Sequence, residues 1–169
     1  MTIGMRSTLL ALEVLLGKEI PGWLRCDPCF KSAVECAIEL VGLGNDLIGL
    51  GKDLAHFSKE SSPAAASTSK KTTWPNIVLA YKAQEECSLE DAINYFIDRH
   101  ASLVAIFDAQ VETFLAERCP LDDQEVLRAY FYHVRYCVFG FNLWHSTTPR
   151  YTTHPIETDS GTIKFTVAA

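Results

Sequence analysis

The stretch Asn-Asp-Leu-Ile-Gly-Leu-Gly-Lys-Asp, residues 45–53, decides how the rest of the chain is interpreted. On an α-helix, residues four apart lie above one another, so Asn45, Gly49 and Asp53 form one column with Lys52 beside it. An amide oxygen and a carboxylate are the hard ligands that Mg²⁺ selects, and a neighbouring lysine suits a phosphate. The alternative interpretation is a polar stripe on a surface helix. The apolar residues that precede or fall within the stretch have helical spacing: Ala33, Ala37, Leu40, Val41, Leu47 and Ile48.

Apolar spacing and helix breakers predict an all-α chain. We expect a first helix from Arg6 to Gly17, and a second that Asp27 caps and Pro28 begins. Ser88 with Asp91 forms a capping-box-like start for another helix, and Asp122 or Asp123 is expected to cap the last one. The predicted architecture is an antiparallel helical bundle. Its expected parts are a helix at 28–57, a flexible loop at 58–73, long helices at 89–119 and 123–146, and a tail at 152–169.

The helix that carries the 45–53 stretch is rich in glycine. Each glycine inside a helix costs about 0.5–1 kcal/mol relative to alanine. Close approach of another element or a ligand would explain such glycines, and drift in a weakened helix is the alternative. The glycines are Gly42, Gly44, Gly49 and Gly51.

The pattern Asn-Asp-Leu-x-x-x-x-Lys-Asp resembles the second metal-binding motif of class I terpene synthases, which runs Asn-Asp-x-x-Ser-x-x-x-Glu and commonly has Lys before the Glu. The resemblance extends to about Tyr151. It implies that residues 1–151 are a partial class I terpene synthase domain, similar to the C-terminal half of that fold. The other matching segments are Thr2–Gly4, Leu16–Pro21, Asn76–Val78, Cys87–Ile93, Gly140–Trp144 and Thr148–Tyr151.

The resemblance also implies a substrate, a cofactor and a set of site residues. Class I terpene synthases are lyases that bind a prenyl diphosphate, such as farnesyl diphosphate, through Mg²⁺ and cyclise the cation left when diphosphate departs. By position, Asn45 and Asp53 would ligate Mg²⁺, and Lys52 would neutralise the diphosphate. Arg150 and Tyr151 would hydrogen-bond the diphosphate, to which the arginine fork is suited.

The last long helix is strongly aromatic, and in this family such rings line the cavity. We expect Trp144 to stabilise the carbocation through its ring face. The chain departs from the family pattern at Gly49, where a Ser or Thr ligand is missing, and at Asp53, which is one methylene shorter than Glu. No aspartate-rich metal motif precedes Asn45. The chain is therefore expected to be the C-terminal part of a terpene cyclase. The alternative is a catalytically inactive helical remnant that binds an isoprenoid or a protein partner.

Composition excludes other classes of function. The net charge of −6 argues against nucleic-acid binding, which needs a basic face, but not against a diphosphate accompanied by divalent cations. No stretch of the 169 residues approaches the roughly 18 apolar residues of a membrane span, so we expect a soluble, cytoplasmic protein. Half a helical bundle would leave an apolar face exposed, which predicts self-association.

Overall fold

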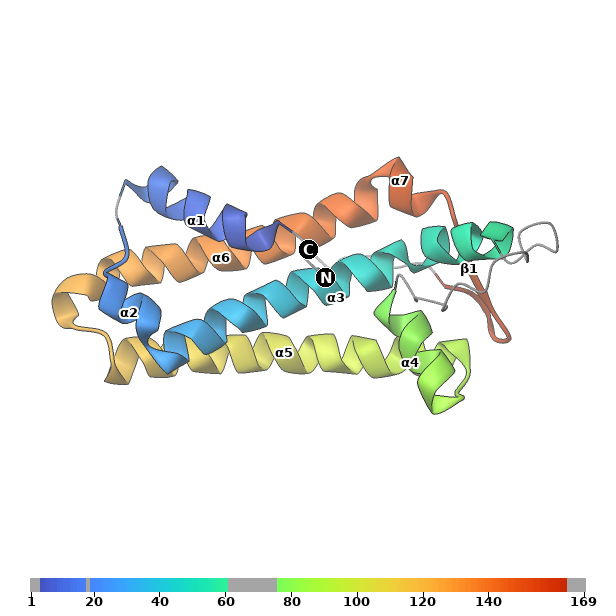
Figure 1. Ribbon diagram of the computed structural model, residues 1–169, viewed down its shortest axis with the longest axis horizontal. Helices are drawn as coiled ribbons and strands as arrows, with labels where there is room; N and C mark the ends of the chain where they lie inside the picture. The colour runs from blue at the N-terminus through green and yellow to red at the C-terminus, as the bar shows by residue number, and fades with distance from the viewer. Residues whose placement is uncertain (1–3, 18, 61–75, 164–169) are drawn as a thin grey trace. The chain divides into compact units, whose positions relative to one another are not determined.

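The computed structural model describes residues 4–17, 19–60 and 76–163 (Figure 1). The predicted all-α fold class is confirmed, and a two-stranded antiparallel hairpin is the one sheet within these ranges. None of the described helices is long and apolar enough to cross a membrane. The elements are α1 (Met5–Leu16), α2 (Gly22–Cys26), α3 (Pro28–Glu60), α4 (Ile77–Glu85), α5 (Leu89–Glu117), α6 (Leu121–Thr147), α7 (Pro149–Thr152), β1 (Ile156–Thr158) and β2 (Gly161–Ile163).

Several helices begin where the side chains can satisfy free backbone N–H groups. Asp27 Oδ1 accepts hydrogen bonds from the backbone N–H of Cys29 at 2.7 Å and of Phe30 at 3.3 Å, which caps α3. Ser88 Oγ accepts from the N–H of Asp91 at 3.0 Å and caps α5 in the predicted way. These caps are local, so the sequence pattern reveals them.

The start of α6 and the end of α3 are among the expected boundaries that differ from the structure. Helix α6 begins at Leu121, so Asp122 and Asp123 lie in its first turn and neither caps it from outside; there they still complement the positive end of the helix dipole. Helix α3 extends to Glu60, into the range expected to be a loop. The remainder of that expected loop, including Lys70 and Lys71, lies outside the described residues.

The chain forms two compact units. The first comprises Met1–Gly42 and Arg99–Phe141. Its core is aromatic: the ring of Phe30 on α3 lies 5.7 Å from that of Phe114 on α5 and 5.4 Å from that of Phe131 on α6. Burying each such ring contributes about 1.5–3 kcal/mol. These contacts join α3, α5 and α6 within the first unit.

The second unit comprises Leu43–Asp98 and Asn142–Ala169, and it holds every residue of the predicted site. The ring of Tyr81 on α4 stacks at 4.3 Å on that of Tyr95 on α5. Part of the expected tail forms the β1–β2 hairpin, in which buried Ile156 pairs with Ile163; residues after Ile163 lie outside the described ranges.

Two of the α3 glycines are places of close approach in the second unit. A Cβ on Gly44 would overlap the side-chain oxygen of Asn142 on α6. A Cβ on Gly51 would overlap the backbone carbonyl oxygen of His154, just before β1. Glycine at these positions lets α6 and the chain before β1 lie directly against the α3 backbone. The close-approach interpretation therefore applies to Gly44 and Gly51.

Candidate diphosphate and metal site

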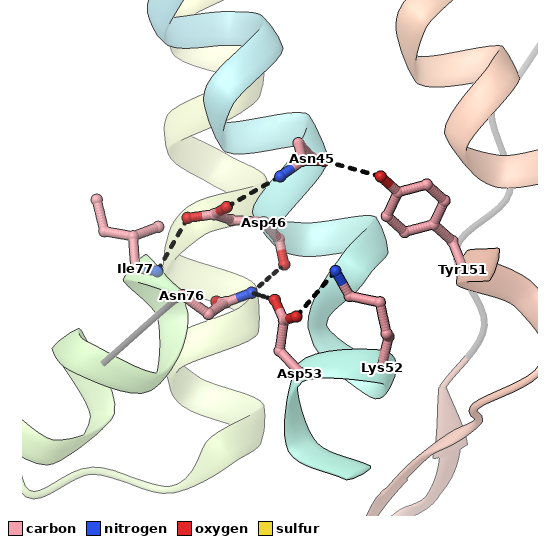
Figure 2. A network of polar contacts seen from close by, with 7 residues as sticks. All are labelled: Asn45, Asp46, Lys52, Asp53, Asn76, Ile77 and Tyr151. Carbon is pink, nitrogen blue, oxygen red and sulfur yellow. Dashed lines mark hydrogen bonds and ion pairs between the residues drawn. The ribbon is translucent and has the colours of Figure 1, made fainter. Parts of the chain in front are cut away.

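Tyr151 is the residue at which the predicted site comes together. Its hydroxyl donates to Asn45 Oδ1 at 3.4 Å, joining α7 to α3 across 106 residues of sequence (Figure 2). Lys52 Nζ lies 5.2 Å from the centre of the Tyr151 ring, and the guanidinium carbon of Arg150 lies 5.7 Å from it. The ring centre of Trp144 lies 5.9 Å from that of Tyr151 in an edge-to-face arrangement, and Trp144 is 52% exposed. One tyrosine thus contacts an amide, two cations and an indole.

Asp53 lies one turn below Gly49 on α3, and both of its carboxylate oxygens are engaged. Oδ1 pairs with Lys52 Nζ at 3.0 Å, and Oδ2 accepts a hydrogen bond from Asn76 Nδ2 at 2.9 Å (Figure 2). Gly49 itself is buried. A Cβ built on it would lie 3.5 Å from Tyr151 Cε1 and 3.7 Å from Asp53 Oδ2, which are ordinary van der Waals distances. The third position of the column therefore has room for a small side chain.

Two buried residues without a predicted role complete the network. Asp46 is 4% exposed and Asn76 is 1% exposed. Burial raises the pKa of the Asp46 carboxyl, and hydrogen bonds from the Ile77 N–H and Asn45 oppose that rise. Asn76 was visible in the sequence as a polar residue directly before a helix, which is a cap signal. Nothing local indicated the burial of Asp46.

His145 is a further residue of the site that sequence reasoning missed. It lies on α6, is buried, and its ring centre is 4.8 Å from that of Tyr151. Burial lowers the pKa of His145, and the positive charges of Lys52 and Arg150 lower it further. Burial and the two neighbouring positive charges thus favour the neutral form of the His145 imidazole.

The side chains present limit what the site can offer to a metal ion. Within residues 4–17, 19–60 and 76–163, no group of three or more His, Cys, Asp or Glu side chains gathers. Asn45 and Asp53 supply two oxygen donors, and Gly49 supplies none. Mg²⁺ is usually held by one or two carboxylates, and water and substrate phosphate complete its six ligands. The donor set therefore fits a magnesium ion that arrives with a diphosphate, and Lys52 and Arg150 suit the same anion.

Fold and site together define an all-α protein with a polar, cation-bearing site centred on α3 and α7. The chain matches the family described as terpene synthase family 2, C-terminal metal binding, over residues 1–105. The chain therefore belongs to this family, and the resemblance inferred from its motifs is confirmed. No curated protein matches the chain in a sequence comparison.

The family match covers only some of the residues of the predicted site. It contains Asn45, Lys52 and Asp53, and it ends before Trp144, Arg150 and Tyr151. The family description includes metal binding, which fits the α3 column. The domain boundary at residue 151, the identity of the metal and the role of each side chain remain predictions.

Proposed function

We propose that this chain binds the diphosphate group of a prenyl diphosphate together with Mg²⁺, as the diphosphate-binding part of a class I terpene synthase. The observation that supports this is the meeting of Asn45, Lys52 and Arg150 at Tyr151, because these groups suit a metal-bridged polyphosphate and come from α3 and α7. The reaction class is that of a carbon–oxygen lyase, followed by cyclisation to a terpene.

Each side chain has a distinct task in this proposal. Mg²⁺, held by Asn45 and Asp53, would neutralise the leaving diphosphate. The Lys52 ammonium adds a positive charge, and the Tyr151 hydroxyl donates to a diphosphate oxygen in place of Asn45. The Arg150 guanidinium can bind two oxygens side by side. These groups stabilise negative charge as the carbon–oxygen bond breaks.

The carbon part of the substrate needs a different environment. The allylic cation left after diphosphate departs is attracted to the face of an aromatic ring. Trp144 is the candidate, since its ring contacts that of Tyr151 and so lies close to the proposed diphosphate position. Exclusion of water protects this cation from premature capture.

The direct test of binding is thermal stabilisation by Mg²⁺ with inorganic diphosphate. A ligand at 100 times its dissociation constant stabilises the folded state by about 2.7 kcal/mol. For a chain of this size that raises Tm by roughly 5–10 °C. The rise should need both ligands and should be lost in Asn45→Ala and Arg150→Ala. Absence of any rise in the unaltered chain would contradict the proposal.

Gly49 offers a gain-of-function test with a matched control. Gly49→Ser adds a hydroxyl in the metal column, whereas Gly49→Ala adds the same Cβ without an oxygen. Gly49→Ala should gain about 0.5–1 kcal/mol of helix stability, because glycine is replaced inside α3, and Gly49→Ser should gain less, because serine is a weaker helix former than alanine. Only the serine variant should bind Mg²⁺ and diphosphate more tightly. Equal ligand-induced shifts in the two variants would argue against a metal at this column.

A second candidate function is a catalytically inactive helical protein that binds an isoprenoid or a protein partner. The absence of a side-chain ligand at Gly49 favours it, since one of the family's three metal ligands is missing from the column. The two candidates differ in turnover. Mg²⁺-dependent release of diphosphate from farnesyl or geranyl diphosphate supports the lyase, and binding of the same compounds without release supports the inactive protein.

A further inference from the structure

Asp46 determines which end of the Asn45 amide faces Tyr151. Asn45 Nδ2 donates to Asp46 Oδ1 at 3.3 Å, and Asn45 Oδ1 accepts from the Tyr151 hydroxyl (Figure 2). An ionised carboxylate only accepts hydrogen bonds. A reversed amide would place its oxygen against the carboxylate and its NH₂ toward Tyr151. The Asp46 carboxylate therefore keeps the Asn45 oxygen on the side where Tyr151 lies.

Asn76 holds Asp53 in a similar way. Its Nδ2 group donates to the backbone oxygen of Asp46 at 2.7 Å and to Asp53 Oδ2 at 2.9 Å. Its Oδ1 accepts from the N–H of Val78 at 3.0 Å and caps α4. One amide side chain thus uses both of its donor hydrogens and its acceptor. It joins two points on α3, seven residues apart, to the start of α4.

The two residues also support each other. Asp46 Oδ2 accepts from the N–H of Ile77 at 3.0 Å, so the residue after Asn76 is held by the same carboxylate that orients Asn45. Both side chains are almost fully buried, which limits the alternative positions that each can adopt. Unpaired polar groups are costly in such surroundings, so the arrangement is strongly specified.

We propose that Asp46 and Asn76 are positioning residues that present the Asn45 amide oxygen and the Asp53 carboxylate to the magnesium–diphosphate ligand. This inference rests on the proposed function. Neither residue need touch the ligand, because each acts through its hydrogen bonds to a neighbour on the metal column.

The decisive experiment exchanges the side chains of Asn45 and Asp46, which are neighbours on α3. In Asp46→Asn, the new amide must offer its oxygen to the Ile77 N–H, so its NH₂ faces Asn45. The Asn45 amide then turns its own oxygen inward to accept, and its NH₂ faces Tyr151. In the double variant Asn45→Asp with Asp46→Asn, the new carboxylate at position 45 presents an oxygen to Tyr151 in either orientation, because both of its ends are oxygens. One oxygen accepts from the new amide and the other faces Tyr151.

Binding of Mg²⁺ with inorganic diphosphate is measured by thermal shift and calorimetry for each protein. We expect at least a tenfold weaker apparent affinity in Asp46→Asn and recovery to within about threefold of the unaltered chain in the double variant. Asp122→Asn removes the same charge from the exposed first turn of α6 and should bind like the unaltered chain. Asn45→Asp alone measures what a carboxylate at this position adds to the affinity for Mg²⁺, and the recovery in the double variant is compared with it. Unchanged affinity in Asp46→Asn, or no rescue, would overturn the inference.

Two further measurements test the positioning roles of Asn76 and Asp46, and the second does not depend on ligand binding. Asn76→Asp retains the acceptor that caps α4 but loses both donors, so α4 should persist while affinity falls at least about tenfold; unchanged affinity counts against the inference. The side-chain NH₂ resonances of Asn45, followed by NMR without ligand, should shift in Asp46→Asn and remain unchanged in Asp122→Asn. If the unaltered chain fails to bind, the proposed function fails. An unmoved Asn45 resonance then separately refutes the positioning of its amide.

Discussion

Gly51→Ala tests whether the chain before β1 lies against the backbone of α3. A Cβ at this position would overlap the carbonyl oxygen of His154 and lie 3.0 Å from its carbonyl carbon and 3.3 Å from Ile156 Cγ1. Two of these atoms belong to the backbone, which cannot rotate away as a flexible side chain can. Displacement would also move Ile156, which is buried.

The expected magnitude follows from two opposing effects. Replacing glycine inside a helix gains about 0.5–1 kcal/mol. Overpacking a closely packed site costs about 1–3 kcal/mol, and the severe backbone overlap places Gly51 in the upper half of that range. We therefore expect the free energy of unfolding to fall by roughly 1–2.5 kcal/mol.

Gly140→Ala is the matched control. Gly140 is exposed on α6, and no described atom lies within 4 Å of a Cβ built there. This variant should gain about 0.5–1 kcal/mol. Equilibrium urea unfolding, followed by circular dichroism, measures both changes. The reasoning is refuted if Gly51→Ala is as stable as Gly140→Ala, because the close approach would then carry no energetic weight.

Three further predictions concern pH, capping and assembly. Burial lowers the pKa of His145 below 6.5, so the folded protein loses stability as pH falls below that value. His145→Gln should make the urea midpoint less dependent on pH, and an unchanged dependence would contradict this. Asn76→Ala should cost about 2–4 kcal/mol in urea unfolding, against about 1 kcal/mol for the exposed cap Ser88→Ala; equal costs would contradict the network. The chain should self-associate in sedimentation velocity, less so as Tyr136→Glu, since Tyr136 on α6 is 61% exposed; a monomer at high concentration would contradict this.

Much of the helical fold could be predicted because its signals are local. Asp27 and Ser88 satisfy N–H groups two or three residues away, so their sequence positions were sufficient. The start of α6 was predicted two residues late, because its first turn includes Leu121, an exposed leucine outside the apolar pattern. The β1–β2 hairpin was not predicted, since strand pairing depends on contacts beyond the short Ile/Phe/Val alternation of the tail.

The sequence by itself determined that Asn45, Gly49 and Asp53 share one face of a helix, because helical periodicity is a property of the backbone. It also carried the motif that identifies the family. Only the tertiary structure decided that Tyr151 meets Asn45, that Gly51 touches the chain before β1, and that Asp46 and Asn76 are buried and bonded. These contacts join segments up to 106 residues apart, and such pairings arise from packing of the whole chain, for which no local rule of spacing exists.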